Sequence, residues 1–245
     1  MRRILVVGGA NGIGLSIATE LASKDSCEKV YIVDKNRIDS DKINEKFECL
    51  YFDLTNSDYS IFDKFKDIDS LIITAGFGKL SLFKYIPESH IIDSFAVNSI
   101  APIRIIHKFI DRLHSPNPFY CGVMVSIAGF MSSPFFAVYG ATKAALKIFI
   151  ESVNVELEKS GTQNRILNVS PGSIQGTSFN KGQTDLSITR PLAQEIIGHI
   201  ESHDDLFIPK YNEVFKNVLE RYHEDFRKEG LHSYEYKLNS GRVKG

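Results

Sequence analysis

The sequence predicts an α/β protein: a single doubly wound domain, residues 1–245, built around a parallel sheet of about seven strands. Three observations lead to this prediction. Short apolar runs recur along the 245 residues, helical stretches separate them, and no Gly- or Pro-rich linker divides the chain. Runs that are apolar on both faces are typical of strands buried beneath helices, and their alternation with helices is typical of a parallel sheet.

Seven apolar runs are predicted to be strands, and three long stretches between them carry helical spacing. The predicted strands lie at 2–7, 29–34, 47–53, 69–76, 119–126, 164–172 and 205–209. In the first helix, predicted over 11–24, Ile13 and Ile17 recur at the helical period. Comparable patterns predict helices over 90–114 and 135–157.

The last part of the chain is less regular. Polar residues with weak periodicity fill 173–190, which we expect to form a mobile lid over a bound substrate. Helices are expected at 191–203 and 212–229, and the apolar side of the second is expected to pack into the core. Residues 230–245 show no clear pattern and are expected to form an irregular tail.

Composition and charge exclude several classes of protein. The net charge is −1, so no basic field favours nucleic acid or an anionic membrane. No run reaches the roughly 18 apolar residues of a membrane span, and the apolar run behind Arg2 and Arg3 is too short for a signal peptide. The three widely spaced cysteines fit a reducing compartment. We therefore expect a cytoplasmic protein that binds neither nucleic acid nor a membrane.

A glycine turn joins the first predicted strand to the first helix. Gly8, Gly12 and Gly14 follow the spacing G-x-x-x-G-x-G. Glycine admits positive φ and lets a pyrophosphate approach the N–H groups of a helix amino terminus, although a plain tight turn would use the same residues. Asp34 ends the second strand, where its carboxylate can accept from both ribose hydroxyls and repel a 2′-phosphate. This pattern favours NAD(H) over NADP(H), while two basic residues close behind Asp34 oppose that preference.

Tyr139 and Lys143 lie four residues apart at the start of a predicted helix and so share one face. A phenol with a pKa of about 10 is a poor acid–base catalyst near neutral pH, and a neighbouring ammonium lowers that pKa. The pair would then exchange a proton with an alcohol or carbonyl while a nicotinamide exchanges a hydride. For an isolated pair the alternative is packing by the tyrosine, with the lysine reaching toward solvent.

Further polar residues at strand ends and in a helix strengthen the catalytic interpretation. Ser126 ends the fifth strand, where its hydroxyl can bond a substrate oxygen or complete a turn. Asn98 lies inside an apolar helical stretch, where its amide is either functional or a satisfied structural group. Asp53 ends the third strand and can accept from an adenine amino group or cap a turn.

Together these motifs resemble the short-chain dehydrogenase/reductase family. The resemblance covers residues 4–177 and rests on motifs in the family's order and at its separations: "GGANGIG", Asp34, "FDLT", "TAG", "VNSIAP", "MVSIAG", "YGATKAAL" and "NVSPG". It implies a Rossmann-type sheet of about seven parallel strands and NAD(P)-dependent interconversion of alcohols and carbonyls. It also implies a homodimer or homotetramer.

The resemblance implies a role for each candidate residue. Tyr139 would be the general acid/base, Lys143 would hold the nicotinamide ribose and lower the pKa of the tyrosine, and Ser126 would orient the substrate oxygen. Asn98 would hold a water in a proton relay. Together with Tyr139 and Lys143, the residues expected to contact the cofactor are Gly8, Asn11, Gly12, Ile13, Gly14, Asp34, Asp53, Leu54, Ala75, Gly76, Pro171, Gly172, Ile174 and Thr177.

Several positions depart from the family pattern. Val7 stands where Thr is usual, which removes a side-chain hydrogen bond beside the glycine turn, and Thr74 stands where Asn is common. Gly176 occupies the place of a cofactor-binding Thr, and Thr177 follows one residue later. The end of the chain lacks the usual glycine-rich closing segment. None of these changes falls on the four catalytic positions, so activity is expected.

The expected partner is a small-molecule alcohol or carbonyl. Its pocket is expected to be mainly apolar, with basic residues in reach: Phe77, Lys79, 127–131, Phe135, Phe136, Lys181 and Arg190. The apolar residues suit a steroid, a lipid or an aromatic carbonyl, and the basic ones a phosphate or carboxylate.

Two other functions and one kind of site are weighed against this prediction. The main alternative is a non-catalytic NAD(P)-binding sensor on the same fold, which would not need the four catalytic residues. A sugar-nucleotide epimerase is disfavoured, because the glycine spacing differs and little chain remains for a substrate domain. No metal site is expected, since His199 and His203 lack the Glu of an HExxH motif.

Overall fold

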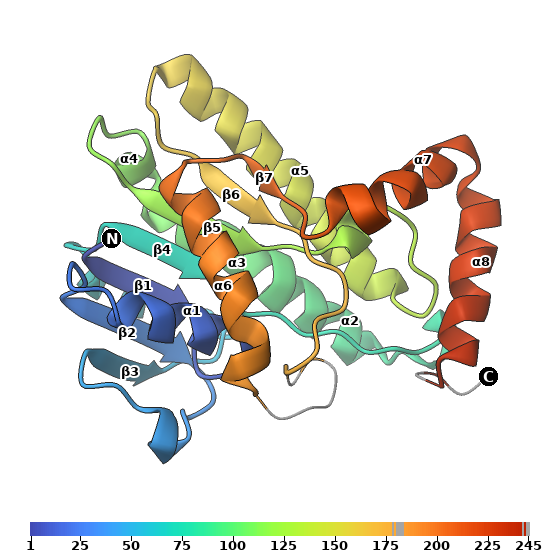
Figure 1. Cartoon of the computed structure of the whole chain (residues 1–245), viewed down its shortest axis with the longest axis horizontal. Helices are drawn as coiled ribbons and strands as arrows, with labels where there is room; N and C mark the ends of the chain where they lie inside the picture. Colours follow the sequence, from blue (N-terminus) through green and yellow to red (C-terminus); the bar gives the residue numbers. More distant parts are fainter. Residues whose placement is uncertain (178, 180–183, 242, 244–245) are drawn as a thin grey trace.

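A computed structural model of the chain, which describes residues 1–177, 179, 184–241 and 243, has a seven-stranded sheet at its centre (Figure 1). Every strand pairing is parallel, and the strands follow the order β3-β2-β1-β4-β5-β6-β7. The predicted α/β class and parallel seven-stranded sheet are confirmed. The strands are β1 (Arg3–Val7), β2 (Lys29–Asp34), β3 (Phe47–Tyr51), β4 (Ser70–Ile73), β5 (Tyr120–Met124), β6 (Ile166–Val169) and β7 (Leu206–Phe207).

Helices connect successive strands. The α-helices are α1 (Gly12–Ala22), α2 (Glu88–Phe95), α3 (Ala101–Lys108), α4 (Ile110–Leu113), α5 (Ala137–Ser160), α6 (Leu186–Glu201), α7 (Lys216–Glu224) and α8 (Phe226–Asn239). Two π-helical turns are η4 (Ala96–Ile100) and η7 (Tyr211–Phe215). The short 3₁₀ turns are η1 (Ser40–Lys42), η2 (Ser60–Lys64), η3 (Phe83–Tyr85) and η5 (Ile127–Gly129).

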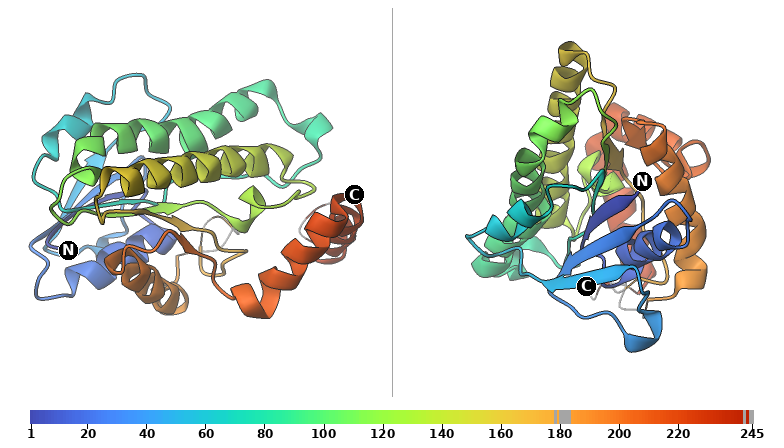
Figure 2. Two further views of the ribbon diagram at one scale, coloured as in Figure 1. Left: turned by 90° about the horizontal axis from the view of Figure 1, so that it is seen from above. Right: turned by 90° about the vertical axis from the view of Figure 1, so that its left-hand side faces the viewer.

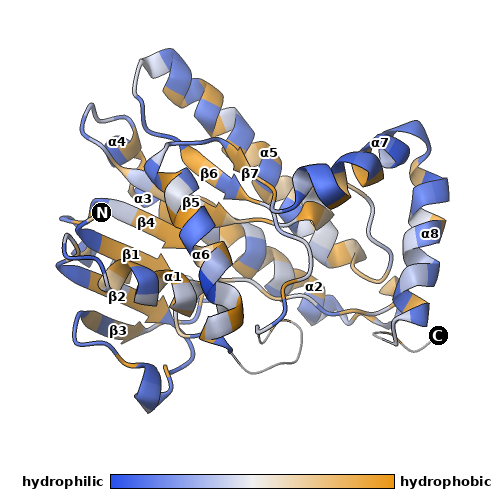
Figure 3. Cartoon of the chain, in the orientation of Figure 1, coloured by the Kyte–Doolittle hydropathy of each residue, from blue (hydrophilic) through white to orange (hydrophobic). Residues whose placement is uncertain are grey.

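The sheet is covered by helices on both faces, as Figure 2 shows from above. One apolar cluster joins the sheet to α3 and α5 and includes Ile105 and Leu146. A second joins the opposite face to α1 and α6 and includes Ile17 and Ile196. Figure 3 shows the apolar residues concentrated on the inner strands, which explains why those strands read as continuous apolar runs.

The sheet changes direction beside β1. Strand β1 pairs with β2 on one side and with β4 on the other, so successive connections run outward in opposite directions from this point. In sheets of this kind ligands bind outside the carboxyl ends of the strands at the reversal. The glycine turn follows β1 directly, so it lies at this position.

The structure corrects three expectations about the last part of the chain. The segment 173–190 was expected to be irregular throughout, but helix α6 begins at Leu186 because Asp185 caps it by accepting from the Ser187 N–H. The predicted helix 212–229 is broken at Asp225, which caps α8 by accepting from two backbone N–H groups. The predicted irregular tail 230–245 is wrong as far as Asn239, where α8 ends.

The expected core packing of the last helix is also wrong for most of its apolar residues. In η7 and α7, Leu219 is buried, whereas Val214 is exposed. Phe226, at the start of α8, is 56% exposed. The two helices lie beyond the end of the sheet rather than against a face of it (Figure 1), so only one side of each has protein to contact.

Candidate active site

The glycine turn is a close-packed cradle. Gly8 and Gly12 have positive φ values of 87° and 54°, which glycine adopts without strain. A Cβ added to Gly8 would lie 2.4 Å from the Ala75 backbone nitrogen, and one added to Gly14 would lie 2.3 Å from the Gly8 carbonyl oxygen. Ala75 therefore lies against the turn, and no larger side chain fits at Gly8 or Gly14.

The side chain of Thr74 forms a hydrogen bond with the glycine turn that the side chain of Val7 cannot form. Its Oγ1 donates to the Gly8 carbonyl oxygen at 2.9 Å and lies 3.3 Å from the Val7 carbonyl oxygen. The backbone N–H of Thr74 also donates to Val7. The hydrogen bond that the family places on the residue before the first glycine therefore comes here from the neighbouring strand.

The Asp34 carboxylate is hydrogen-bonded to the protein backbone. Its Oδ2 accepts from the Ala10 N–H at 3.0 Å, and its Oδ1 accepts from the Asn36 N–H at 2.8 Å. The carboxylate is thus fixed beside the glycine turn. Asp53 accepts from the backbone and hydroxyl of Thr55, and the backbone hydrogen bond chiefly lowers the pKa of its carboxyl. This turn role was the alternative considered for Asp53.

Ser126 and Tyr139 lie side by side, as the sequence predicts. Ser126 is at the end of the extended segment after β5, where its Oγ accepts from the Ala128 N–H. Burial raises the pKa of Tyr139 to about 12, and a hydrogen bond with the Ser126 side chain acts in the opposite direction. The expected lowering of this pKa is therefore wrong for the present structure, because removal of the phenol from water disfavours phenolate.

Lys143 is buried beneath the same face of α5. Its side chain is 2% exposed, and its Nζ donates to the Met124 carbonyl oxygen at 2.8 Å. Burial lowers the pKa of Lys143 to about 7. A Cβ added to Gly76 would lie 3.3 Å from both Lys143 Nζ and Asn98 Oδ1, so three predicted site residues meet at this point.

Asn98 is fully buried in the π-helical turn η4, between α2 and α3. Its Oδ1 accepts from the Phe77 N–H, and its Nδ2 donates to the Phe77 carbonyl oxygen and to Thr142 Oγ1. Single π-turns inside α-helices often occur at functional sites. The amide is satisfied by protein groups and links η4 to α5 directly below Tyr139, since Thr142 Oγ1 also donates to the Tyr139 carbonyl oxygen.

The segment after β6 closes over the glycine turn. Thr177 Oγ1 donates to the Ile174 carbonyl oxygen, and the Thr177 side chain lies 3.6 Å from a Cβ added to Gly12. The Gly12 N–H donates to Thr184 Oγ1 at 2.9 Å. Sequence reasoning missed Thr184, since the two residues are 172 positions apart. Residues 178 and 180–183 of the expected lid, including Lys181, lie outside the described residues.

The other expected cofactor residues lie around these groups. The Pro171 carbonyl oxygen accepts from the Ile127 N–H beside Ser126. Gly172 faces the Phe215 ring, which a Cβ would approach to 2.6 Å. Leu54 is buried in the cluster beneath α3 and α5, and Ile13 is buried in the cluster on the other face. Asn11 is the residue that precedes α1.

Aromatic rings surround the Tyr139 phenol. The ring centroids of Phe136 and Phe179 lie 5.2 and 5.3 Å from that of Tyr139. A Cβ added to Gly78 would lie 2.9 Å from the Tyr139 ring and 3.0 Å from that of Phe179. Phe136 was expected in the pocket, and Phe179 belongs to the segment 173–190 that was expected to cover the substrate, whereas Gly78 was not identified from the sequence.

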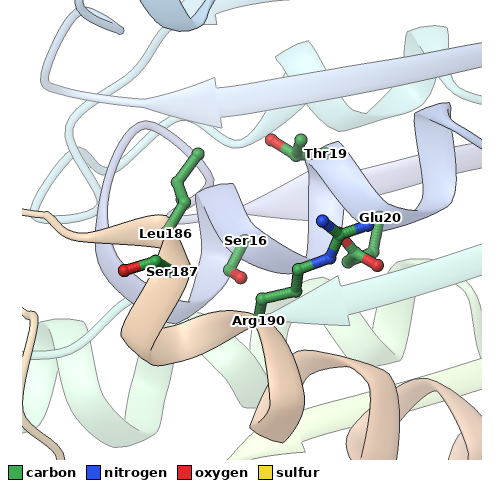
Figure 4. A pocket seen from close by; sticks show the side chains of 6 residues that line it. All are labelled: Ser16, Thr19, Glu20, Leu186, Ser187 and Arg190. Atoms are coloured by element: carbon green, nitrogen blue, oxygen red, sulfur yellow. The ribbon is translucent and has the colours of Figure 1, made fainter.

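Arg190 does not line this aromatic site. It lies on α6 and bonds Glu20 of α1 at 2.8 Å, beside a cavity of about 280 Å³ (Figure 4). The cavity is lined by Ser16, Thr19, Glu20, Leu186, Ser187 and Arg190. The expectation that Arg190 reaches the substrate is therefore wrong, because α6 carries it to the opposite face of the sheet from Tyr139 on α5.

The described residues offer neither a metal site nor a membrane-spanning helix. Within them no cluster of three acidic, His or Cys side chains is placed to hold a metal ion. His199 instead bonds Asp204 through Nδ1 at 2.6 Å. None of the helices in the part of the chain that the structure describes is long and apolar enough to cross a membrane.

The chain belongs to the short-chain dehydrogenase family, whose sequence profile, described as short chain dehydrogenase, matches residues 2–186. "Uncharacterized oxidoreductase TDA5" of Saccharomyces cerevisiae is 28% identical over 185 residues, an alignment that covers 72% of this chain and 56% of the yeast protein. Human "17-beta-hydroxysteroid dehydrogenase type 1" is 26% identical, with 69% of this chain and 56% of that protein covered. The chain thus spans little more than half the length of these two relatives.

Solved structures share the fold along almost the whole chain. A short-chain dehydrogenase from Streptomyces avermitilis superimposes with a TM-score of 0.74 at 18% identity, covering 99% of this chain and 100% of that one. Another, from Sphingobium yanoikuyae in complex with NADPH, gives 0.73 at 19% identity and covers 92% and 96%. The family and the fold are therefore those of the short-chain dehydrogenases.

Proposed function

We propose that this protein interconverts an alcohol and a carbonyl by NAD(P)(H)-dependent hydride transfer, with Tyr139 as general acid/base. The nearness of the Ser126 side chain, just after β5, to the Tyr139 phenol, at the start of α5, carries this proposal. One substrate oxygen would then contact both hydroxyl groups. A phenol with a raised pKa is protonated at neutral pH, so it can donate a proton to a carbonyl oxygen.

The residues around the glycine turn fit a dinucleotide. Gly8 and Gly14 leave a cradle that a Cβ would fill, and the turn opens at the amino terminus of α1. The nicotinamide ring, when bound, supplies or accepts the hydride. Lys143 would hold the ribose beside it, and Pro171, Gly172, Ile174 and Thr177 would frame the ring. Asn98 would hold the water that links Lys143 to solvent.

We propose NAD(H) as the preferred cofactor. Asp34 is held by the Ala10 and Asn36 N–H groups, so it cannot easily turn away from a ribose. Its charge would repel a 2′-phosphate. The test is titration of the purified protein with NADH and NADPH, followed by fluorescence. Tighter binding of NADPH would contradict the proposal.

The substrate class proposed is an apolar carbonyl or alcohol with a flat face. The rings of Phe136 and Phe179 flank the Tyr139 phenol and offer it an apolar, planar environment. The name of the human relative points to a hydroxysteroid for that protein. We include steroids in the panel to be tested here, beside small aromatic ketones.

The proposal also includes the oligomeric state of the protein and a cytoplasmic location. Family likeness favours a homodimer or homotetramer, which light scattering would establish. The three cysteines are free thiols, as a reducing cytoplasm would keep them.

The experiment that tests the catalytic proposal is Tyr139→Phe. This change removes the phenol oxygen and keeps the ring, so turnover of a carbonyl panel with NADH should fall by about 10²–10⁴-fold. NADH binding should stay within about twofold, since the ring still fills its place. Retained turnover would contradict the assignment of Tyr139.

A non-catalytic cofactor sensor is the second candidate, and one observation favours it. With the pKa of Tyr139 at about 12 and that of Lys143 at about 7, the pair is not primed for proton abstraction near neutral pH. A sensor would bind NADH tightly and reduce no carbonyl in a broad panel. Any turnover that Tyr139→Phe abolishes would rule it out.

A further inference from the structure

Helix α8 contacts the loop that leads into the catalytic helix. The loop runs from Ser126 to Phe136, and α8 lies beside it beyond the end of the sheet (Figure 1). Lys237 Nζ donates to Ser133 Oγ at 2.7 Å and to the Pro134 carbonyl oxygen at 2.8 Å. The Tyr234 ring stacks on Phe135 with a centroid distance of 4.6 Å. Tyr234 and Lys237 are three residues apart, so one face of α8 makes these contacts.

Phe135 holds an unusual backbone conformation at this contact. Its φ is 67°, in the left-handed region that bulky residues avoid. Such a conformation persists only where the surroundings enforce it, and it is common at functional sites. Here the side chain is 4% exposed beneath Tyr234, and the carbonyl oxygen accepts from the Ser81 N–H at 2.9 Å.

The conformation of Phe135 sets the start of α5. Phe136 follows directly, and its carbonyl oxygen accepts from the Gly140 N–H at 2.7 Å in the first turn. The Phe136 ring contacts the Tyr139 ring, and Lys237 Nζ lies 5.7 Å above the Phe136 ring. A change of φ at Phe135 would therefore redirect both Phe136 and the Tyr139 phenol.

Helix α8 is itself anchored. Arg221 of α7 forms two hydrogen bonds with the buried carboxylate of Glu229, at 2.7 and 3.1 Å. Paired contacts of this kind fix orientation as well as distance. The Phe215 ring, just before α7, packs against Gly172 on the expected nicotinamide side. The hairpin α7–α8 therefore spans from Gly172 to the loop before Tyr139.

We infer that Tyr234 and Lys237 are positioning residues of the candidate active site: from α8 they hold Phe135 left-handed and so set the place of Phe136 and Tyr139. The inference rests on the proposed function for its catalytic meaning. The structural part, that α8 holds the loop, stands without it. Tyr234 and Lys237 contact the loop at Ser133–Phe136, which is separate from the glycine turn, so cofactor binding is not expected to depend on them.

The test compares three single variants of the full chain. Tyr234→Ala removes the stack on Phe135, and Lys237→Met removes the hydrogen bonds to Ser133 and Pro134. Tyr236→Ala is the control, because Tyr236 lies on the same helix and is 60% exposed. Hydrogen exchange of the peptide covering 132–142 should be about tenfold faster in the first two variants than in the control. NADH affinity, from fluorescence, should stay within about twofold in all three.

Kinetics then connect the loop to turnover. With NADH and acetophenone as the probe, kcat/KM should fall by roughly tenfold in Tyr234→Ala and Lys237→Met and be unchanged in Tyr236→Ala. Tyr234→Phe keeps the stacked ring and should restore both exchange and turnover. In a Phe135→Gly background, Tyr234→Ala should change kcat/KM by less than about twofold, because loss of the Phe135 ring has already removed the stack.

The outcomes separate the two proposals. If exchange and kcat/KM in Tyr234→Ala and Lys237→Met match those in Tyr236→Ala, the positioning role is wrong. If the unmodified protein reduces no carbonyl, the proposed function fails, and the exchange measurement alone decides whether α8 holds the loop.

Discussion

The region matched by the family profile and the α7–α8 hairpin beyond it are held together in different ways. Residues 2–186 contain six of the seven strands, most of the two buried apolar clusters, and all the residues predicted to be catalytic or to bind the cofactor. In α7 and α8, Leu219 and Glu229 are the buried residues, and polar and ring contacts attach the hairpin to one loop. We therefore expect the first region to contain the reacting groups and the hairpin to set the geometry of the loop 126–136 before Tyr139.

The largest expected effect is on the free energy of unfolding, and it comes from the burial of Lys143 in the first region. Between pH 7 and about 10 the unfolded chain keeps the Lys143 proton, while the folded chain, with its pKa near 7, releases it. Stability should therefore rise with pH across this window, by up to roughly 5 kcal/mol for this group. Lys143→Met should abolish that slope in urea unfolding at pH 6 to 9.

A matched control for this prediction lies one turn further along α5. Lys147 pairs with Glu151, so Lys147→Met should leave the pH slope intact. Parallel slopes in Lys143→Met and the unmodified protein would show that Lys143 is not neutralised by burial.

A second prediction concerns the glycine cradle. In Gly14→Ala the new methyl group would lie 2.3 Å from the Gly8 carbonyl oxygen and 2.4 Å from Thr74 Oγ1. Overpacking of this kind costs about 1–3 kcal/mol, so NADH should bind up to about a hundredfold more weakly in a fluorescence titration. Gly198→Ala is the control, because a Cβ there meets nothing within 4 Å. Equal NADH affinity in both variants would place the cofactor elsewhere.

The third prediction concerns a substitution that destabilises only the α7–α8 hairpin. Arg221→Met leaves the buried Glu229 carboxylate without its two hydrogen bonds. Hydrogen exchange in α7 and α8 should become roughly tenfold faster while exchange in the sheet is unchanged. Arg221 holds the pKa of Glu229 low. In the unmodified protein, the stabilisation that the Arg221–Glu229 pair gives the hairpin should therefore be lost as the pH falls through that lowered pKa. Faster exchange in the sheet would mean that the two regions unfold as one unit.

The smallest expected effect concerns Thr184, which bonds the turn where a pyrophosphate would lie. Thr184→Val removes the acceptor of the Gly12 N–H. If the hydroxyl competes with phosphate, NADH should bind roughly threefold to tenfold more tightly, the worth of one neutral hydrogen bond. Thr184→Ser should behave like the unmodified protein. Weaker binding in Thr184→Val would mean that the hydroxyl contacts the cofactor directly.

Much of the first region could be predicted because its signals are local. The strands are continuous apolar runs, and the glycine turn follows the first of them directly. Ser126 and Tyr139 were paired by their place in a motif series, and the structure puts them in contact. The pKa of Tyr139 could not be predicted in this way, because its direction depends on burial by Phe136 and Phe179, and the second of these comes from a distant segment.

The second region could not be predicted because its signals are weak or distant. Asp225 caps α8, yet the helical pattern around it appears continuous, so the break was missed. Gly230 disfavours a helix, although α8 passes through it. The hydrogen bond that attaches α8 to the loop before α5 joins Lys237 to Ser133, which are 104 positions apart. No periodicity within either segment indicates such a contact.

The order in which the sheet pairs has a consequence for the protein as it leaves the ribosome. Strands β1 to β5 pair only with one another and, through β5, with β6, so the centre of the sheet is complete in sequence once Met124 has been made. Domains begin to fold from the amino terminus during synthesis. The glycine turn can therefore form early, whereas the loop before α5 receives Tyr234 and Lys237 only after residues 125–237 have also been made. We expect the growing chain to bind the dinucleotide before it is able to catalyse the proposed reaction.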